Sequence, residues 1–518
     1  MPAIISDQFR IMNAETFVKS LVSIGSTANK YYTFIGQPNS LNPESGGDLS
    51  WGVSPPPPLD SFEYESNIKD TIITLKKISE LDVSRVIRKE QWVSGTTYEM
   101  YRNDYSAYNL SPITNSTTLY DVNYYVINED FRVYICLDNG ATPENPKGNP
   151  SLDQPTFVGL EASPAGTSGD GYIWKYLYTI KPIEFVKFDS VNFIPVPENW
   201  GSSGESISIK NNATNGKVEV VSIKDRGATY TKSTTYNNIP ILGDGVGGKV
   251  TIVTNSFGEV SEIVVTDGGA GYTKGIIKFE PGAPGIPSTL GLTDINNAAQ
   301  FDVIIPPKGG HGYDVYRELG AYRVLVYSRY ETDQDNPDAI VGNDFATVGI
   351  IKNPTINTNN DANYASGLKS LKLKTTSTNT VYPIDREITQ TISTGTTAIG
   401  FVASWDNITG VLKYYQPVGL AKSDVSYVIN DFRSTVGVGG STLINCQSTP
   451  SSLAIDTSFS GISTTINNKI YRLGTTFTSG ISSSEYVKGS GELLYIDTRQ
   501  AIPRSVSQKE DIKIILEF

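Results

Sequence analysis

A short segment of this chain occurs twice. Residues 216–233 (GKVEVVSIKDRGATYTKS) align without gaps to residues 258–275 (GEVSEIVVTDGGAGYTKG) at an offset of 42, with eight of 18 positions identical. In each copy, alternating apolar residues lead to a glycine-containing turn and then to a tyrosine, which is typical of a β-hairpin whose turn needs positive φ. Two copies are fewer than a solenoid usually needs. The repeat therefore predicts a compact β domain built from a duplicated unit, at about 205–305.

Strand patterns dominate beyond the N-terminal part of the chain. The segments 124–137 and 172–180 are rich in β-branched and aromatic residues and are bounded by Gly, Asn or Pro. Pro195 and Pro197 interrupt the next run, which favours an edge strand or a connector. Short strand-like runs between turn signals across 356–480 predict a second small β barrel or sandwich.

Helical patterns are confined to the N-terminal part. Residues 13–25 begin with a capping asparagine, carry apolar residues at helical spacing and end in glycine, so they predict an amphipathic helix. The spacing of Ile68, Ile72 and Leu75 predicts a second helix that begins after Ser66. The expected fold class is therefore mainly β with a few N-terminal helices (α+β), arranged as several antiparallel β sandwich or barrel modules.

The last residues of the chain, 512–518, alternate between apolar and polar side chains. This pattern predicts a terminal strand that docks in a sheet of this chain or of a neighbouring subunit. Together the patterns predict a core with two helices and a sheet over 1–204, the duplicated insert over 205–305, a return to the core over 306–355, a small barrel or sandwich insert over 356–480, and C-terminal strands that complete the core over 481–518.

The charge balance argues against nucleic acid as a partner. The chain has 42 Lys and Arg against 54 Asp and Glu, a formal net charge of −12, and no basic run. Binding to a phosphate backbone draws on clustered positive charge. The chain also lacks a run of 18 apolar residues, and its first residues lack the pattern of a secretion signal. We therefore expect a protein that is not secreted, binds no nucleic acid and does not insert into a membrane.

Residues that usually carry catalysis or bind metals are scarce. Cys136 and Cys446 lie 310 positions apart, so they form neither a CxxC metal pair nor a disulfide framework. The single histidine, His311, excludes a multi-histidine zinc site and is flanked by glycines. We interpret it as a turn residue or a buried hydrogen-bonding histidine, because a catalytic role requires a partner carboxylate and a nucleophile. No catalytic, cofactor-binding or metal-binding residue is predicted.

Two segments come close to known ligand motifs. Residues 243–250 (GDGVGGKV) have the glycine and lysine spacing of a phosphate loop, but Val250 occupies the place of the Mg²⁺-binding hydroxyl. We interpret this segment as a turn between strands. Asp333, Asp335 and Asp338 approach the spacing of a calcium loop, but the rest of the EF-hand pattern fails, which favours a solvated acidic loop.

One predicted strand carries four aromatic residues at alternate positions, namely Tyr172, Trp174, Tyr176 and Tyr178. Alternation places them on one face. We interpret that face as core or as a subunit contact rather than as a platform for sugars.

Motifs along much of the chain follow the order of a known family. They are Phe9-Arg10, Phe17, Ser23-Ile24-Gly25, Phe34-Ile35-Gly36, Trp51 with the proline run before Asp60-Ser61, Val86-Ile87-Arg88 with Trp92, Gly95-Thr96-Thr97-Tyr98, Cys136-Leu137-Asp138, the block GDGYIWKYL at 169–177, Phe345 with Ile350-Ile351-Lys352-Asn353-Pro354, SGELLYI at 490–496 and IILEF at 514–518. This set resembles the baseplate wedge protein (gene product eight) family of T-even-like contractile-tailed bacteriophages. The block at 169–177 is the most specific of these motifs.

The resemblance covers about 1–204, 310–355 and 485–518. The two β-rich stretches depart from the family, and such additions are similar to those of elaborated relatives in marine cyanophages. The resemblance implies a non-enzymatic homodimer in the tail baseplate of the virion, made in the bacterial cytoplasm. Its implied partners are the other wedge subunits and tail-fibre or peripheral baseplate proteins, and its implied role is baseplate assembly and the coupling of host attachment to sheath contraction. The alternatives are a receptor- or glycan-binding tail appendage and a polysaccharide-degrading tail enzyme.

Overall fold

Antiparallel β-sheets make up most of the protein. The computed structural model describes residues 4–21, 28–37, 54–55, 57–202, 204–331, 344–357, 363–375, 380–416, 429–447, 449–504 and 509–518. Strands far outnumber helices over these residues, so the predicted mainly β, multi-module class is confirmed. The chain forms two compact units: residues 1–18, 84–325 and 515–518 make the first, and 19–83 and 326–514 make the second. The domain boundaries expected from the sequence stay predictions.

The first unit is centred on a four-stranded sheet in the order β4 (Tyr125–Ile127), β5 (Arg132–Asn139), β7 (Tyr172–Thr179) and β6 (Ser163–Pro164). In the register of β5 and β7, Cys136 lies opposite Trp174 and Tyr134 lies opposite Tyr176. Both strand regions predicted here, 124–137 and 172–180, are confirmed, the first of them as the hairpin β4–β5.

Shorter elements complete this part of the first unit. They are α3 (Pro182–Phe188), α4 (Glu205–Asn212), α5 (Val315–Glu318), the 3₁₀ turns at Leu119–Asp121 and Ile295–Asn297, and β3 (Val83–Arg88) paired with β8 (Phe193–Pro195). Strand β8 ends at Pro195 and lies at the edge of its sheet, as the two prolines predicted.

The first helix begins earlier than predicted. Helix α1 spans Asp7–Leu21, whereas the sequence placed its start at Asn13. The Ser6 hydroxyl accepts the Phe9 amide at 3.4 Å, and Asp7 places a carboxylate in the first turn, where the helix dipole favours negative charge. The predicted end at Gly25 lies outside the described residues.

The second predicted helix was wrong in its extent. Helix α2 spans Phe62–Asp70, with the Ser61 side chain accepting the Tyr64 amide at its start. Ile72 and Leu75, which were assigned to this helix, lie in strand β2 (Ile72–Lys77). Four consecutive residues there, 72–75, are buried, and a run that is buried on both faces carries no alternation to separate it from a helix.

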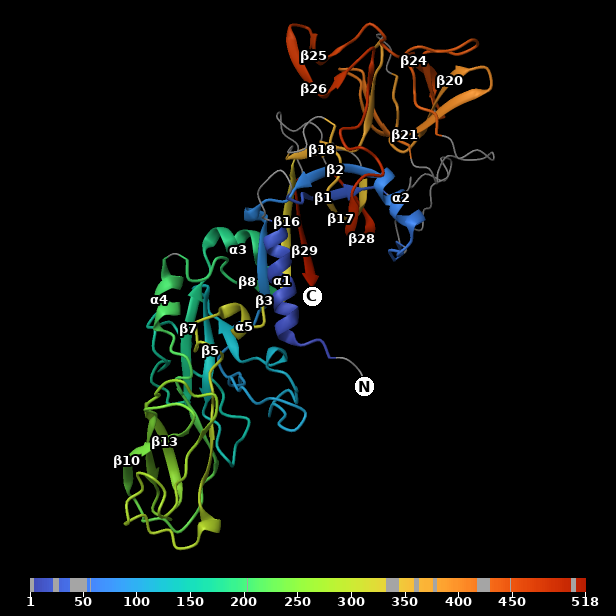
Figure 1. Cartoon of the computed structure of the whole chain (residues 1–518). Coiled ribbons are helices and arrows are strands. Elements are labelled where there is room, and N and C mark those ends of the chain that lie inside the picture. The colour runs from blue at the N-terminus through green and yellow to red at the C-terminus, as the bar shows by residue number, and fades with distance from the viewer. Residues whose placement is uncertain are drawn as a thin grey trace. The chain divides into compact units, whose positions relative to one another are not determined.

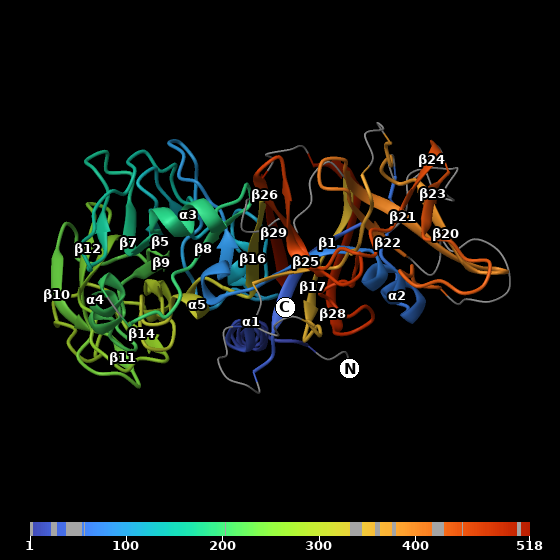
Figure 2. The ribbon, with the colours of Figure 1, turned by 90° about the horizontal axis from the view of Figure 1, so that it is seen from above.

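The duplicated insert (residues 205–305) belongs to the first unit and holds three small antiparallel sheets. These are β10 (Thr235–Pro240), β12 (Lys249–Thr254) and β13 (Val260–Asp267); β11 (Leu242–Gly243) with β14 (Gly275–Ile276); and β9 (Val221–Asp225) with β15 (Gln300–Val303). Its own apolar core includes Val218, Ile239, Val250 and Phe279. Figure 2 shows α4, β9, β10, β11 and β14 close together in the green part of the ribbon.

The glycine turns of the repeat have the predicted positive φ. Gly227 and Gly269 occupy matching positions, with φ of +61° and +60°. The amide of each donates to an aspartate carboxylate two residues before it, Asp225 at 2.9 Å and Asp267 at 3.0 Å. The predicted hairpin is wrong, however, because the strands on either side of each turn do not pair: β9 pairs with β15, and β13 pairs with β12.

Instead, each copy of the repeat forms a backbone hydrogen bond with the other copy. The Tyr272 amide donates to the Gly216 carbonyl at 3.3 Å, and the Tyr230 amide donates to the Gly258 carbonyl at 3.0 Å. A Cβ added at either glycine would lie 2.6 Å or less from the backbone of the opposite copy's tyrosine. The two copies therefore need glycine at these matched positions, and this reciprocal contact explains why neither copy folds as a separate hairpin.

The second unit contains a five-stranded sheet, which we call the frame sheet. Its order is β18 (Tyr364–Ser366), β2, β1 (Tyr31–Gly36), β17 (Asp344–Lys352) and β28 (Glu492–Pro503). Figure 1 shows β2, β1, β17 and β28 side by side, with α2 beside them. A 3₁₀ turn at Glu80–Asp82 precedes β3.

A seven-stranded sheet makes up most of the predicted barrel region. Its order is β24 (Thr449–Ala454), β23 (Leu443–Cys446), β20 (Glu387–Ser393), β21 (Thr396–Asp406), β22 (Val411–Tyr415), β19 (Lys369–Lys372) and β27 (Ile481–Ser482). The Lys374 amide donates to the Ala454 carbonyl, and the Asp456 amide donates to the Lys372 carbonyl. These bonds join the end of β24 to that of β19, so the sheet closes on itself as a small barrel. The hairpin β25 (Gly461–Ile466) and β26 (Lys469–Phe477) follows.

The C-terminal strand docks within this chain. Strand β29 (Lys509–Glu517) lies next to β16 (Arg323–Glu331) in their sheet. Arg329 forms a bidentate pair with Asp511, and Arg323 donates to Glu517 at 2.9 Å. Of the two predicted docking places, the structure therefore uses a sheet of the same chain.

Candidate functional site

His311 lies in a tight glycine loop before α5. Its Nδ1 is 2.6 Å from Oε1 of Glu318, and the Gly312 amide donates to the other oxygen of that carboxylate at 2.7 Å. Both side chains are buried, and Tyr101 packs edge-on against the imidazole ring. No hydrogen bond joins this ring to a serine, threonine or cysteine in the described part of the chain. His311 is thus a buried hydrogen-bonding histidine, which is one of the two roles predicted from the sequence.

The segment resembling a phosphate loop is a connection between strands. It starts at the end of β11 and continues into β12, as the sequence predicted. The Gly248 amide, which a phosphate would require, instead donates to the Tyr272 hydroxyl at 3.1 Å. The acidic loop with Asp333, Asp335 and Asp338 lies outside the described residues.

The four alternating aromatic residues of β7 form core. Tyr172, Trp174, Tyr176 and Tyr178 are each at most 1% exposed. Tyr172 and Trp174 stack with their ring planes 14° apart. The sequence had left a place in the core or a subunit contact open for these residues, and the structure places them in the core.

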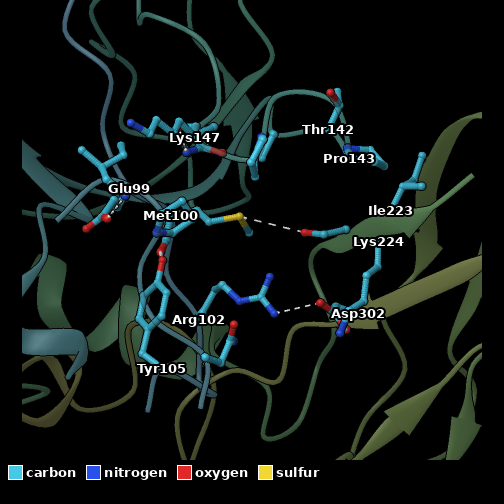
Figure 3. A pocket seen from close by; sticks show the side chains of 17 residues that line it. Glu99, Met100, Arg102, Tyr105, Thr142, Pro143, Lys147, Ile223, Lys224 and Asp302 are labelled. Atoms are coloured by element: carbon cyan, nitrogen blue, oxygen red, sulfur yellow. Dashed lines mark hydrogen bonds and ion pairs between the residues drawn. The ribbon is translucent and has the colours of Figure 1, made fainter. Parts of the chain in front are cut away.

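A cavity of about 250 Å³ lies in the first unit. Its walls are two loops, 99–113 and 139–147, together with strands β9 and β15 of the duplicated insert. Figure 3 shows Met100, Arg102 and Tyr105 on one side, with Ile223, Lys224 and Asp302 opposite them. Because four distant chain segments supply these side chains, no sequence motif marks the cavity, and the sequence analysis missed it.

Ion pairs compensate the strongest charges in the cavity wall. Arg102 forms a bidentate pair with Asp104, at 2.9 and 2.8 Å, and also donates to Asp302 at 3.0 Å. Burial alone would raise the pKa of Asp104, but the hydrogen bonds and the charge of Arg102, together with the hydrogen bond from Asn109, outweigh it, so that this pKa is lowered. Lys224 lies 3.9 Å from Asp302, and the third cation of the wall, Lys147, is exposed to solvent.

Two further polar side chains of the wall are almost fully buried. Glu99, which is 2% exposed, accepts the amides of Ile113 and Thr114 at 2.9 and 3.0 Å. Asn139, 3% exposed, donates through Nδ2 to the carbonyls of Tyr98 and Lys147, which fixes the orientation of its amide. Its Oδ1 is buried and accepts no hydrogen bond.

Helix α1 also presents an apolar surface. Ile11, Ala14 and Val18 face the core, while Phe9 and Met12, on another side of the helix, are 47% and 50% exposed. We call Phe9 and Met12 the α1 stripe, because residues three positions apart lie on one helical face. Exposed apolar groups also follow one another at α3, where Ile183, Val186 and Val191 are each more than 60% exposed.

Comparisons with known proteins leave the family open. No family model matches the sequence, and no curated protein is significantly similar to it. Over the described residues, no three His, Cys, Asp or Glu side chains come together as a group able to hold a metal ion. None of the helices described is long and apolar enough to cross a membrane.

Proposed function

We propose that this protein is a structural subunit of the baseplate wedge in the tail of a contractile-tailed bacteriophage. It acts as a homodimer that contacts other wedge subunits and peripheral baseplate or tail-fibre proteins. Its role is in baseplate assembly and in coupling host attachment to sheath contraction, and it catalyses no reaction.

The pairing of the resemblance motifs with one another carries this proposal. In the frame sheet, Ile350, Ile351 and Lys352 lie opposite Tyr495, Leu493 and Glu492, so the motifs at 350–354 and 490–496 form adjacent strands. The motif at 34–36 pairs with the other edge of β17. In the first unit, the motif at 136–138 pairs with the block at 169–177. Motifs far apart in the sequence thus pair within the same sheets. Such pairing is expected if the motifs belong to the conserved structural core of one family.

The apolar surface of α1 supports a role through subunit contacts. Interface cores are enriched in aromatic residues and methionine and are depleted in charge. The α1 stripe combines Phe9 with Met12, and Phe9 itself belongs to a resemblance motif. We assign this stripe to a subunit contact in the wedge.

Light scattering after size-exclusion chromatography tests the proposal. The full chain is expected to have twice the mass of a single chain and to join isolated wedge complexes. A double substitution, Phe9→Glu with Met12→Glu, is expected to abolish at least one of these contacts, because it buries charge in an apolar interface. Val264→Glu, at another exposed apolar position, is the control and is expected to leave both intact. A monomer that does not join wedge complexes would contradict the proposal.

A further inference from the structure

The hairpin β25–β26 has no part in the proposed function. We infer that the β26 edge of this hairpin binds an extended, acidic segment of another protein as a third strand. That segment carries two acidic residues three positions apart, with apolar residues between them. The inference goes beyond the baseplate assignment and does not depend on it, since purified chain is enough to test it.

The outer part of the hairpin, residues 462–472, has exposed apolar side chains on both faces, and we call it the arm. At its base, Leu473 packs with Val411 of the barrel. Within the arm, Ile462 and Ile470 lie on opposite faces and are 48% and 70% exposed. Figure 1 shows the hairpin beside the strands of the barrel. A two-stranded hairpin without a covering layer is only marginally stable in water, so these side chains indicate a surface that a partner covers.

The turn of the hairpin determines which backbone groups point outward. Asn467 and Asn468 have φ of +49° and +62°, as in a type I′ turn, and Ile466 lies opposite Lys469. Such a turn closes on a pair that exchanges both hydrogen bonds, and pairs with and without these bonds alternate along the strands. The next residue of β26, Ile470, therefore directs its amide and its carbonyl away from β25.

Both edges of the arm are able to receive a strand. Arg472 repeats the outward orientation two residues further along β26, and Ser463 and Thr465 have it on β25. In the part of the chain that the structure describes, no third strand pairs with either edge. Unpaired edges of this kind accept an extended segment of another protein through main-chain hydrogen bonds.

Charge distinguishes the two edges. Between Asp456 and Glu485 the sequence has no acidic residue, and its only charged residues there are Lys469 and Arg472, both exposed and both on β26. The chain as a whole has a net charge of −12, so this positive stretch differs from its surroundings. Opposite charges on neighbouring strands stabilise a sheet, and like charges destabilise it. An added strand with acidic residues therefore fits β26.

The order of side chains along β26 sets the pattern of the partner. Side chains alternate between the two faces of a strand, so Lys469 and Arg472 lie on opposite faces. A strand with the pattern acidic, apolar, apolar, acidic places one acid opposite each cation. Its apolar residues then lie opposite Ile470 and Tyr471.

A second copy of this chain does not fit the β26 edge. Two β26 strands that pair antiparallel with Ile470 opposite Tyr471 place Lys469 opposite Arg472, which brings like charges together. Strand β25 carries no charged residue, so its edge lacks this repulsion. Pairing of two copies through β25 is the alternative that the test distinguishes.

Fluorescence anisotropy with the full chain tests the inference. The probe is a labelled octapeptide of sequence TTEVVETT, and its charge control is TTKVVKTT. The acidic peptide is expected to bind at least about tenfold more tightly than the lysine peptide. Its binding should also slow hydrogen exchange at residues 469–473.

Two proline variants locate the binding edge. Ile470→Pro removes an outward-pointing amide of β26 without removing a hydrogen bond within the hairpin, and it is expected to weaken binding at least about tenfold. Thr465→Pro makes the matched change on β25 and is expected to bind as wild type does. Arg472→Glu reverses one charge without altering the backbone and replaces Ile470→Pro if that variant does not fold.

The inference is upheld if the acidic peptide binds more tightly than the lysine peptide and if Ile470→Pro or Arg472→Glu, but not Thr465→Pro, weakens that binding. It is overturned if the acidic peptide does not bind, if the lysine peptide binds equally well, or if Thr465→Pro abolishes binding. Loss of a homodimer in Ile470→Pro would assign β26 to contacts between copies and would also overturn it. Failure of the baseplate assignment, by contrast, would leave these peptide results unchanged.

Discussion

The two inserts differ in how much charge joins them to the rest of their units. Ion pairs join the duplicated insert to its unit: Lys175 with Glu219 at 2.8 Å, Arg226 with Glu144 at 2.8 and 3.0 Å, and Arg102 with Asp302. Its Ile209, Val220 and Ile304 also belong to the apolar core of the first unit. The barrel insert (residues 356–480) shares an apolar core with the frame sheet. Phe401, Ala403 and Tyr415 of the barrel pack with Ile35, Ile73 and Val348 of the frame sheet.

This difference predicts how each attachment responds to mutation and to solution conditions. Buried apolar contacts lose free energy in proportion to the volume removed and are insensitive to salt and pH. Paired charges depend on both partners, and removing one of them costs more than replacing both. The barrel insert is thus expected to be a fixed part of its unit, whereas the charged contacts of the duplicated insert can be exchanged in pairs.

The largest effect is expected at the shared apolar core. Phe401 is 1% exposed, so Phe401→Ala should lower the free energy of unfolding by about 3–5 kcal/mol through lost burial and a cavity. Chemical denaturation followed by the fluorescence of nearby Trp405 measures it. Phe257→Ala, at a residue 76% exposed in the duplicated insert, is the matched control and should change stability little. Equal effects of the two substitutions would refute the shared core.

The next effect concerns the buried ion pair of the duplicated insert. Lys175 is 4% exposed and Glu219 is 9% exposed, so Lys175→Met leaves a buried carboxylate whose remaining ion pair, with Lys217, is long at 3.9 Å. We expect a loss of about 3 kcal/mol, with faster hydrogen exchange across the insert. The double variant Lys175→Met with Glu219→Leu should recover most of the loss. If the double variant is as unstable as the single one, attachment by charge is the wrong description.

A smaller loss of stability is expected when the buried tyrosine hydroxyl of either copy of the repeat is removed. The Tyr230 hydroxyl accepts the Ala299 amide and donates to the Phe279 carbonyl, and the Tyr272 hydroxyl accepts the Gly248 amide and donates to the Ile241 carbonyl.

Tyr230→Phe and Tyr272→Phe each leave two buried backbone groups unpaired and should each cost about 1–3 kcal/mol in thermal or chemical unfolding. Tyr313→Phe, at a residue 45% exposed, is the control. A cost at one copy only would show that the copies are not structurally equivalent.

The smallest effect is a pH dependence of stability that arises from Asp385, where the barrel insert contacts the frame sheet. The Asp385 carboxylate accepts hydrogen bonds from Gln37 and Tyr415. Burial raises the pKa of Asp385 to about 6, despite these bonds. The folded state therefore holds the proton more tightly than the unfolded state, and stability should fall as pH rises from about 4 to about 6.

Asp385→Asn removes this loss and also suits the positive φ of 62° at this position. We expect the variant to exceed the wild type by about 1 kcal/mol above pH 6 and to lose that advantage below pH 4. Denaturation curves at several pH values measure the difference. An advantage that does not change with pH would assign the effect to the backbone alone.

The sequence predicted elements well where a local pattern decides the structure. Strand composition and turn signals predicted β7 and the β4–β5 region, and turn spacing predicted short strands across residues 356–480, where a barrel or a sandwich was expected. Local patterns failed where packing decides: Ile72 and Leu75 have helical spacing but lie in a fully buried strand, and the repeat looks like two hairpins although its copies close on each other.

The candidate site was beyond the reach of local patterns. The sequence predicted His311 as a turn residue or a buried hydrogen-bonding residue, and its partner Glu318 became evident only in the fold. The cavity depends on loops 99–113 and 139–147 meeting strands about 80 residues or more further along the chain. An unpaired atom such as Oδ1 of Asn139 is defined by its surroundings, which no single-sequence pattern encodes.

The central claim, a structural subunit of the tail baseplate, is tested most directly on intact particles. Electron microscopy of contractile-tailed phage from the source of this sequence, labelled with antibodies against the chain, should place it at the baseplate periphery. The density there should hold two copies in each wedge. Labelling at the capsid or at the tips of fibres, or no labelling of particles at all, would contradict the account.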